Sequence, residues 1–205
     1  MTPNAPGWLV ARPIAHRGLH DARHGVIENS LSAAKAAIAK HFAIECDVQL
    51  SGDGEAMVFH DYSLDRLTRE KGPLDAHSAM TLSRYTLGAS SDCIPRLSDF
   101  LAQVAQRTPV ICEIKSRFDG DMRLAERTAR CACEFGGPIA LKSFDPAIIA
   151  HLRAHREELG IARGLARGTG RRENPRVLVC RHRRGHAGRD DRDRGLRSAR
   201  GALDA

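Results

Sequence analysis

Two acidic side chains interrupt an apolar run that has the composition of a β-strand. Residues 44–50 read IECDVQL and place Glu45 and Asp47 two positions apart. Because side chains of a strand alternate between its two faces, both carboxylates lie on one face and the apolar residues on the other. Buried carboxylates need a counter-charge or a metal ion. The pattern leaves two alternatives, an edge strand with a solvated acidic face or a site that holds positive charge.

Other residues that can do chemistry lie where further predicted strands end. Histidine can exchange protons near neutral pH, while arginine and lysine can neutralise an anion. They are His16 and Arg17 after residues 10–15, His60 after 55–59, and Glu113 with Lys115 in 109–115.

Apolar runs alternate with segments of helical period along most of the chain. We expect strands at 10–15, 44–50, 55–59, 109–115 and 138–142, and helices at 29–40, 97–106, 121–135 and 145–158. Alternating strands and helices predict an α/β fold with a parallel sheet. An open sheet and a closed barrel both place ligands at the carboxyl ends of strands. Polar residues spread over four successive strands favour the barrel, because a ring brings them to one mouth.

Three helix starts carry capping signals. Asn29 or Ser30 can cap the helix that follows, and Ser98 is expected to cap the helix at 97–106. Asp145 and Pro146 fit the cap and first position of the last helix. Asp65 and Arg66 are expected to form a local ion pair.

The positive charge of the chain is concentrated in its last segment. The 205 residues carry a net charge of +7, but residues 1–162 contain 19 Lys and Arg against 20 Asp and Glu. Residues 163–205 contain 13 Arg, no Lys and 5 acidic residues, a net charge of +8. A basic charge therefore does not by itself indicate a nucleic-acid or membrane partner for the rest of the chain.

The Arg-rich tail at 163–205 has no aromatic residue and one strand-like piece at 177–179. It is open to three interpretations: a disordered basic tail, a nucleic-acid-binding arm, or out-of-frame translation of a GC-rich gene. The lack of aromatic residues for base stacking disfavours the nucleic-acid arm. We expect residues 1–162 and 163–205 to be separate units.

The cysteines and apolar runs indicate a reducing, cytoplasmic setting. No signal peptide is evident, and the apolar runs are too short to span a membrane. The six cysteines show no zinc-type spacing; they are Cys46, Cys93, Cys112, Cys131, Cys133 and Cys180.

Several ordered motifs resemble the glycerophosphodiester phosphodiesterase family. They are AHRG at 15–18, IENS at 27–30, IECDVQLSGDGEAMVFHD at 44–61, LDRLT at 64–68, CEIK at 112–115 and KSFD at 142–145. The resemblance covers about residues 14–162 and implies a TIM-type (β/α)8 barrel. It also implies metal-dependent hydrolysis of a small-molecule glycerophosphodiester to glycerol 3-phosphate and an alcohol.

The resemblance implies a role for each matching residue. Glu45, Asp47 and Glu113 would bind one divalent cation, and three carboxylates suit Mg²⁺ or Ca²⁺. His16 and His60 would be the catalytic acid and base, with neither role assigned. Arg17 and Lys115 would contact the substrate phosphate. The role of Glu28 stays open.

The chain departs from the family beyond residue 162. A complete barrel needs about 250 residues, so we expect an incomplete barrel of five to six βα units, with the sixth strand starting near 160–162. An open barrel exposes strand edges, which predicts marginal stability and little or no activity. Two alternatives remain: a non-catalytic basic binding protein acting through its tail, and a sphingomyelinase D-like lipid phosphodiesterase, which shares the fold.

Overall fold

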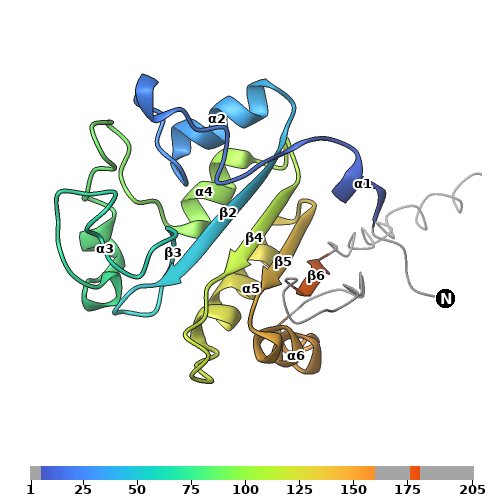
Figure 1. Ribbon diagram of the computed structural model, residues 1–205. Helices are drawn as coiled ribbons and strands as arrows, with labels where there is room; N and C mark the ends of the chain where they lie inside the picture. Colours follow the sequence, from blue (N-terminus) through green and yellow to red (C-terminus); the bar gives the residue numbers. More distant parts are fainter. Residues whose placement is uncertain (1–5, 160–175, 181–205) are drawn as a thin grey trace, which may run out of the picture.

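A single sheet organises the chain (Figure 1). The computed structural model describes residues 6–159 and 176–180. The strand order is β1-β2-β4-β5-β6, and β3 pairs with the far part of β2. The strands are β1 (Ile14–Ala15), β2 (Ala43–Leu50), β3 (Ala56–Val58), β4 (Val110–Ile114), β5 (Ile139–Ser143) and β6 (Arg176–Cys180).

Four of these strands, β1, β2, β4 and β5, run parallel. Their register sets Asp47 beside Glu113, and Glu113 beside Lys142. Because neighbouring residues in register point to the same face, three strands deliver charged side chains to one spot. β2 lies between β1 and β4, so the edge-strand alternative for residues 44–50 is wrong.

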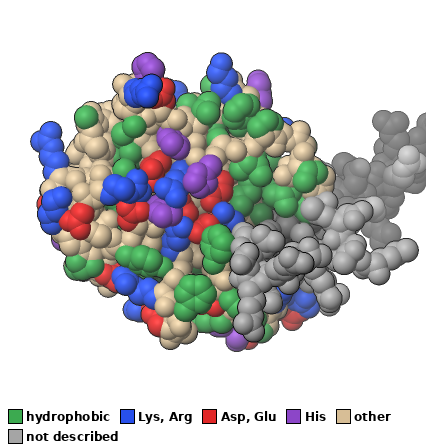
Figure 2. All heavy atoms as spheres, in the orientation of Figure 1, with side chains coloured by type: hydrophobic (Ala, Val, Ile, Leu, Met, Phe, Trp, Pro, Cys, Tyr) green, Lys and Arg blue, Asp and Glu red, His purple; other side chains and the backbone are tan. Residues whose placement is uncertain are grey.

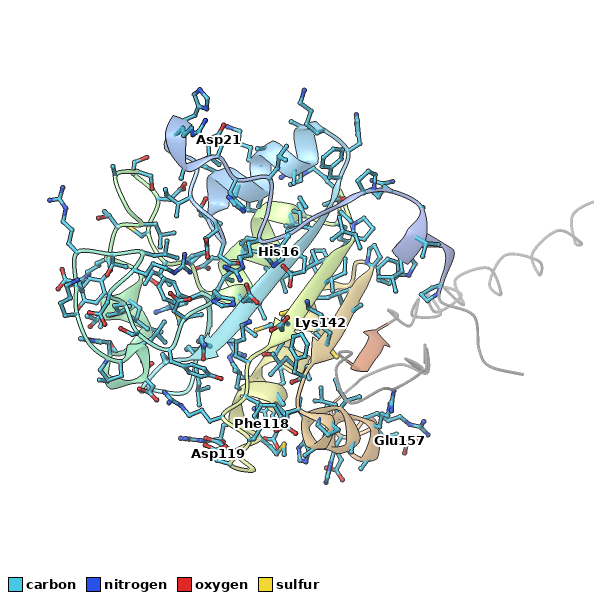
Figure 3. All side chains as sticks on the ribbon, in the orientation of Figure 1. His16, Asp21, Phe118, Asp119, Lys142 and Glu157 are labelled. Atoms are coloured by element: carbon cyan, nitrogen blue, oxygen red, sulfur yellow. The ribbon has the colours of Figure 1, made fainter. Side chains whose placement is uncertain are left out.

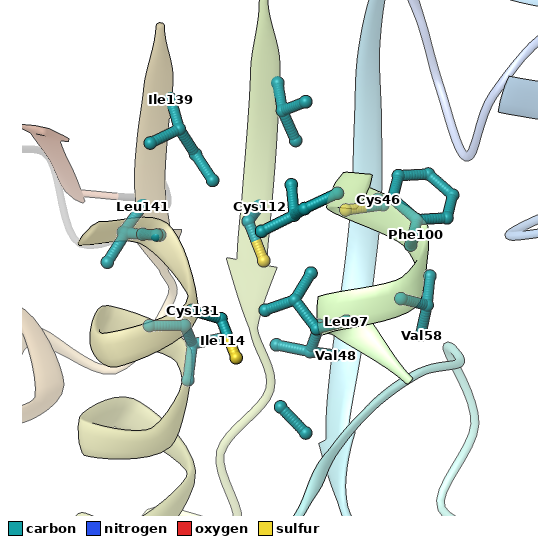
Figure 4. Packing of buried hydrophobic residues seen from close by; sticks show 14 of the residues in the cluster. Cys46, Val48, Val58, Leu97, Phe100, Cys112, Ile114, Cys131, Ile139 and Leu141 are labelled. Atoms are coloured by element: carbon teal, nitrogen blue, oxygen red, sulfur yellow. The ribbon is translucent and has the colours of Figure 1, made fainter. Parts of the chain in front are cut away.

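The opposite face of the sheet is apolar and covered by helices (Figures 1 and 4). Ile44, Cys46 and Val48 of β2 are fully buried on this face, as the period-2 pattern predicts. The helices that cover this face are α2 (Leu31–Ala39), α4 (Leu97–Val104), α5 (Arg123–Phe135) and α6 (Pro146–Ala154). The short helices α1 (Gly7–Val10) and α3 (Ala79–Leu82) pack elsewhere, and 3-10 turns lie at Ala22–His24 and Leu74–Ala76.

The long segment between β3 and α4 packs around its own small core. Its buried side chains are Met57, Phe59, Leu64, Leu74, Ala79, Leu82, Leu87 and Ile94, joined by Ile27. This second core explains why a segment with little regular structure can hold polar residues in place beside the sheet.

Two of the expected strands differ from the structure. Residues 10–15 contain only a two-residue strand, since Val10 ends helix α1. The strand expected at 55–59 is present as β3, but it runs antiparallel to β2 and so adds no parallel unit. The short turn at 51–54 forces this direction, because a parallel neighbour would need a crossover of a dozen or more residues.

The capping predictions are confirmed at two helices and wrong at one. Ser30 accepts a hydrogen bond from the amide of Ala33 at 3.0 Å, and Asp145 accepts one from Ala147 at 2.8 Å. Ser98 does not cap α4, because the helix begins at Leu97 and Arg96 is the cap residue. The last helix ends at Ala154, earlier than expected.

The expected strand at 160–162 and most of the Arg-rich tail lie outside the described residues. Within the tail, the apolar piece at 177–179 belongs to β6, which pairs antiparallel with β5.

The tight turn after β1 generates a stability prediction. Gly18 has φ +79°, and a Cβ there would lie 2.7 Å from Ala33 Cβ and 2.9 Å from its carbonyl carbon. Gly25 has a similar φ of +74° but open space around it. We expect Gly25→Ala to cost about 1–2 kcal/mol of strain, and Gly18→Ala about 1–3 kcal/mol more from the clash.

Urea unfolding of both variants measures the difference. Equal losses of stability in the two variants would show that the contact with Ala33 does not constrain this turn.

Candidate active site

Three carboxylates from two adjacent strands meet on the face of the sheet opposite α2, α4, α5 and α6. Glu45, Asp47 and Glu113 are 5%, 1% and 5% exposed, and each offers an oxygen within 4.8 Å of the others. At this separation the mutual repulsion of ionised groups in a buried site is strong. The cluster therefore requires positive charge, as the sequence pattern indicates.

Three cationic side chains contact the carboxylates. Lys115 Nζ lies 2.6 Å from Glu113 Oε1 and 2.9 Å from Asp47 Oδ1. Lys142 Nζ lies 2.8 Å from both Glu45 Oε1 and Glu113 Oε2. The Nε of Arg17 lies 3.3 Å from Asp47 Oδ2. Figure 3 shows Lys142 on β5 in front of the sheet, on the same side as His16.

These contacts set the ionisation of the site. Burial raises the pKa of Glu113, but hydrogen bonds from Lys115 and Lys142 outweigh it and hold the pKa below its ordinary 4.5. Burial lowers the pKa of Lys142, but the charges of Glu45 and Glu113 bring it above its ordinary 10.5. Glu113 and Lys142 are thus both charged at neutral pH, and their contact is an ion pair.

The turn after β1 aims a backbone donor at the carboxylates. Arg17 and Gly18 both have left-handed φ, +57° and +79°. This conformation places the amide of Arg17 3.0 Å from Glu45 Oε2. A non-glycine residue held at positive φ carries strain, which is common at functional sites.

The side chain of Asn29 holds Asp47 in place through two hydrogen bonds. Its side-chain amide donates to Asp47 Oδ2 at 3.0 Å, and its carbonyl oxygen accepts from the amide of Asp47 at 3.1 Å. Asn29 is 1% exposed and has φ +57°. Its role is therefore to hold Asp47, while the neighbouring Ser30 caps the helix.

The two predicted catalytic histidines adjoin this cluster through neighbouring contacts. The residue after His16 donates its amide to Glu45, and the carbonyl of His60 accepts from Gln49, two positions beyond Asp47 on β2. His16 follows β1 directly and is exposed, and His60 follows β3 and is partly exposed. His60 Nδ1 lies 2.6 Å from Asp61 Oδ1. This contact leaves Nε2 of His60 as the nitrogen free to exchange a proton. Figure 2 shows histidines gathered with basic and acidic side chains at the centre of this face.

A chain of ion pairs connects His60 with the carboxylate cluster. Arg66 contacts Asp61 through Nε at 2.6 Å and Glu28 through its NH2 nitrogen at 2.8 Å. Glu28 in turn accepts from the NH1 nitrogen of Arg17 at 2.7 Å. Arg66 thus pairs with Asp61 and Glu28, and the local pair with Asp65 expected from the sequence is wrong.

The same contacts shift the pKa of each acid. Hydrogen bonds from Arg66, then His60, lower the pKa of Asp61 to about 2. Burial raises the pKa of Glu28, but Arg66 and Arg17 together bring it to about 2. Asp61 raises the pKa of Arg66 above its ordinary value. All of these groups are charged near neutral pH.

The structure brings the predicted site residues into one region and adds two. Arg17 and Lys115 contact the acid triad directly, and the two histidines lie beside it. Lys142 and Asn29 were missed by sequence reasoning. Lys142 lies in the KSFD motif quoted above, but its role depends on the strand register, and Asn29 of the IENS motif was interpreted as a helix cap.

The donor set suits a divalent metal ion. All three groups are carboxylate oxygens, which hard cations such as Mg²⁺ and Ca²⁺ prefer. The carboxylate oxygens lie within 4.8 Å of one another, and the ammonium groups of Lys115 and Lys142 already supply positive charge beside them. Glu45, Asp47 and Glu113 therefore could hold one such ion.

Comparison with known proteins assigns the chain to a known family. Residues 16–178 match the Glycerophosphoryl diester phosphodiesterase family, so the chain belongs to that family. The match extends past residue 162, where the sequence resemblance was expected to end. The family and the barrel-type α/β fold predicted from the sequence are confirmed.

Solved structures agree with this assignment. A glycerophosphodiester phosphodiesterase from Agrobacterium tumefaciens is 26% identical with a TM-score of 0.61, covering 72% of this chain and 64% of its own. A phosphodiesterase from Oleispira antarctica, in complex with the product sn-glycerol-3-phosphate, is 25% identical with a TM-score of 0.60, covering 73% and 65%. A Parabacteroides distasonis enzyme, 19% identical with a TM-score of 0.60, covers 70% and 60% and supports the fold alone.

This chain spans less than two thirds of the length of these solved structures. A search of curated proteins found no match. Neither the tail-binding function nor a sphingomyelinase D-like activity gains support from the comparisons. In residues 6–159 and 176–180, no helix has the length and apolarity needed to cross a membrane.

The ion pairs of Arg66 with Asp61 and Glu28 predict that the free energy of unfolding depends on pH. The lowered pKa values of Asp61 and Glu28 contribute stability that is present above about pH 4.5 and lost as the pH falls toward 2. Arg66→Met removes the partner that both acids share. We expect it to reduce the free energy of unfolding at pH 7 by about 1 kcal/mol, and to flatten the loss at acid pH.

Denaturant unfolding from pH 7 to pH 2 measures this effect. The matched control is Arg69→Met, which removes an exposed arginine three positions away. If the free energy of unfolding of Arg66→Met falls with pH in the same way as that of the parent protein, these ion pairs do not stabilise the fold.

Proposed function

We propose that this chain binds one divalent cation and hydrolyses glycerophosphodiesters to glycerol 3-phosphate and an alcohol. The observation that carries the proposal is the buried triad of Glu45, Asp47 and Glu113, built from family-matching strands. The product complex of the Oleispira antarctica phosphodiesterase supports the glycerol 3-phosphate product. The catalytic unit is residues 1–162, and its cytoplasmic setting stays a prediction.

The charge balance of the site favours a divalent ion together with an anionic substrate. The ion-paired groups comprise five carboxylates and four cationic side chains, leaving one negative charge when the histidines are neutral. A divalent cation and a singly charged phosphodiester together add one positive charge. The filled site is then neutral, which lowers the cost of holding its buried carboxylates charged.

Each residue of the site has a task in the reaction. A bound Mg²⁺ or Ca²⁺ supplies Lewis-acid polarisation of a phosphoryl oxygen. Arg17 and Lys115 donate hydrogen bonds to the phosphate oxygens, where negative charge builds up as the bond breaks. Both side chains are already held beside the triad by ion pairs, so little ordering is needed.

His16 and His60 divide the proton transfers. One takes a proton from the attacking hydroxyl or water, and the other gives one to the leaving alcohol. Asp61 holds the ring of His60 through Nδ1, which leaves Nε2 for the proton transfer. The structure leaves the assignment of acid and base open, as the sequence does.

The metal site predicts stabilisation by divalent cations. Addition of Mg²⁺ or Ca²⁺ should raise the melting temperature, because the ion binds the folded triad and not the unfolded chain. Glu113→Gln should abolish this rise. The control is Glu134→Gln, which changes an exposed glutamate on α5 and should keep it. A rise that survives Glu113→Gln would place the ion elsewhere.

Activity is tested by release of glycerol 3-phosphate from glycerophosphocholine with Mg²⁺ or Ca²⁺. We expect slow turnover, because the barrel is incomplete, and a loss of about 10²–10⁴-fold in His16→Gln and His60→Gln. His41→Asn is the control, since His41 is exposed at the opposite end of β2 and Asn tolerates its φ of +58°. Release that persists in both variants, or that is absent in the parent chain, would overturn the proposal.

A further inference from the structure

The oxygens of the carboxylate triad all lie beside nitrogens of the chain itself. Each of the six oxygens of Glu45, Asp47 and Glu113 lies between 2.6 and 3.0 Å from such a nitrogen. These nitrogens belong to the backbone amide of Arg17, the side-chain amide of Asn29 and the ammonium groups of Lys115 and Lys142. A divalent ion that binds these oxygens therefore enters a site where the chain already supplies positive charge.

Lys142 bridges the two glutamates of the triad. Its Nζ lies 2.8 Å from Glu45 Oε1 and 2.8 Å from Glu113 Oε2, and its side chain is 17% exposed. The strand register fixes this position, because Lys142 is the partner of Glu113 on β5 and points to the same face of the sheet (Figure 3). Among the described residues, these two glutamates are the charged groups in ion-pair contact with Lys142. Its ammonium group thus neutralises the same two carboxylates that a divalent ion would bridge.

The charge balance of the site gives this bridge an energetic consequence. Five carboxylates against four cationic side chains leave one negative charge, so a divalent ion alone would bring the site to one positive charge. With a neutral side chain in place of Lys142, the site would carry two negative charges, which one divalent ion cancels. Two cations among the same buried carboxylates repel each other strongly. Lys142 therefore stabilises the triad and opposes the ion at the same time.

We propose that Lys142 is a resident counter-cation that competes with the divalent ion for Glu45 and Glu113 and so weakens ion binding. This inference rests on the metal site of the proposed function and describes how that site is regulated. The ion must displace the ammonium group from both glutamates. The fold therefore keeps its buried acids neutralised at low cation concentration, and the occupancy of the site follows the concentration of divalent cation.

Lys142→Met tests the competition, because methionine keeps an unbranched side chain and removes the charge. Titration calorimetry of the full chain with Mn²⁺ should show at least about tenfold tighter binding to Lys142→Met than to the parent. Without added ion, the variant should melt at a lower temperature, because two buried glutamates lose their shared partner. Lys35→Met is the matched control. It removes an exposed lysine on α2, behind the sheet, and should match the parent in both measurements.

A measurement on the parent chain decides the question even if Lys142→Met does not fold. Reductive methylation with formaldehyde and a borane, read by peptide mass spectrometry, reports how accessible each lysine amine is. Saturating Mn²⁺ should increase the labelled fraction of Lys142, because the ion releases its ammonium group, and should leave that of Lys35 unchanged.

The outcomes separate this inference from the proposed function. Equal or weaker binding of Mn²⁺ to a folded Lys142→Met, or labelling of Lys142 that saturating Mn²⁺ does not increase, would overturn the competition. Binding of Mn²⁺ to the parent would still leave the metal site of the proposed function standing. Binding of Mn²⁺ by neither protein would instead overturn that metal site, and the inference with it.

Discussion

Repulsion among three buried carboxylates is the constraint on which the rest of this structure depends. Glu45, Asp47 and Glu113 share a space in which their oxygens lie within 4.8 Å and are largely shielded from solvent. Such a cluster is stable only when cations lie among the carboxylates. Lys115 and Lys142 meet part of this need in the chain itself. A divalent ion, with an anionic substrate beside it, meets the remainder.

The fold supplies the geometry that this cluster needs. Parallel pairing of β2, β4 and β5 sets Asp47, Glu113 and Lys142 side by side, while the opposite face of the same strands packs against helices. Two hydrogen bonds from outside these strands then fix the carboxylates. The backbone amide of Arg17, in the left-handed turn after β1, donates to Glu45, and the side chain of Asn29 donates to Asp47. Apolar packing on one face thus holds charged groups at fixed positions on the other.

The sequence predicted what depends on local alternation and missed what depends on register or chain direction. Period-2 spacing correctly put Glu45 and Asp47 together, and the ordered motifs identified the family. Lys142 was missed because its partners come from two other strands, which only the register reveals. The direction of β3 was wrong because an apolar strand has the same pattern in either direction.

The most direct test of the central claim is a crystal structure with Mn²⁺, located by its anomalous scattering. This account predicts one ion bonded to oxygens of Glu45, Asp47 and Glu113, at about 2.0–2.6 Å from each. An ion bound elsewhere, with the three carboxylates held only by Lys115 and Lys142, would contradict it.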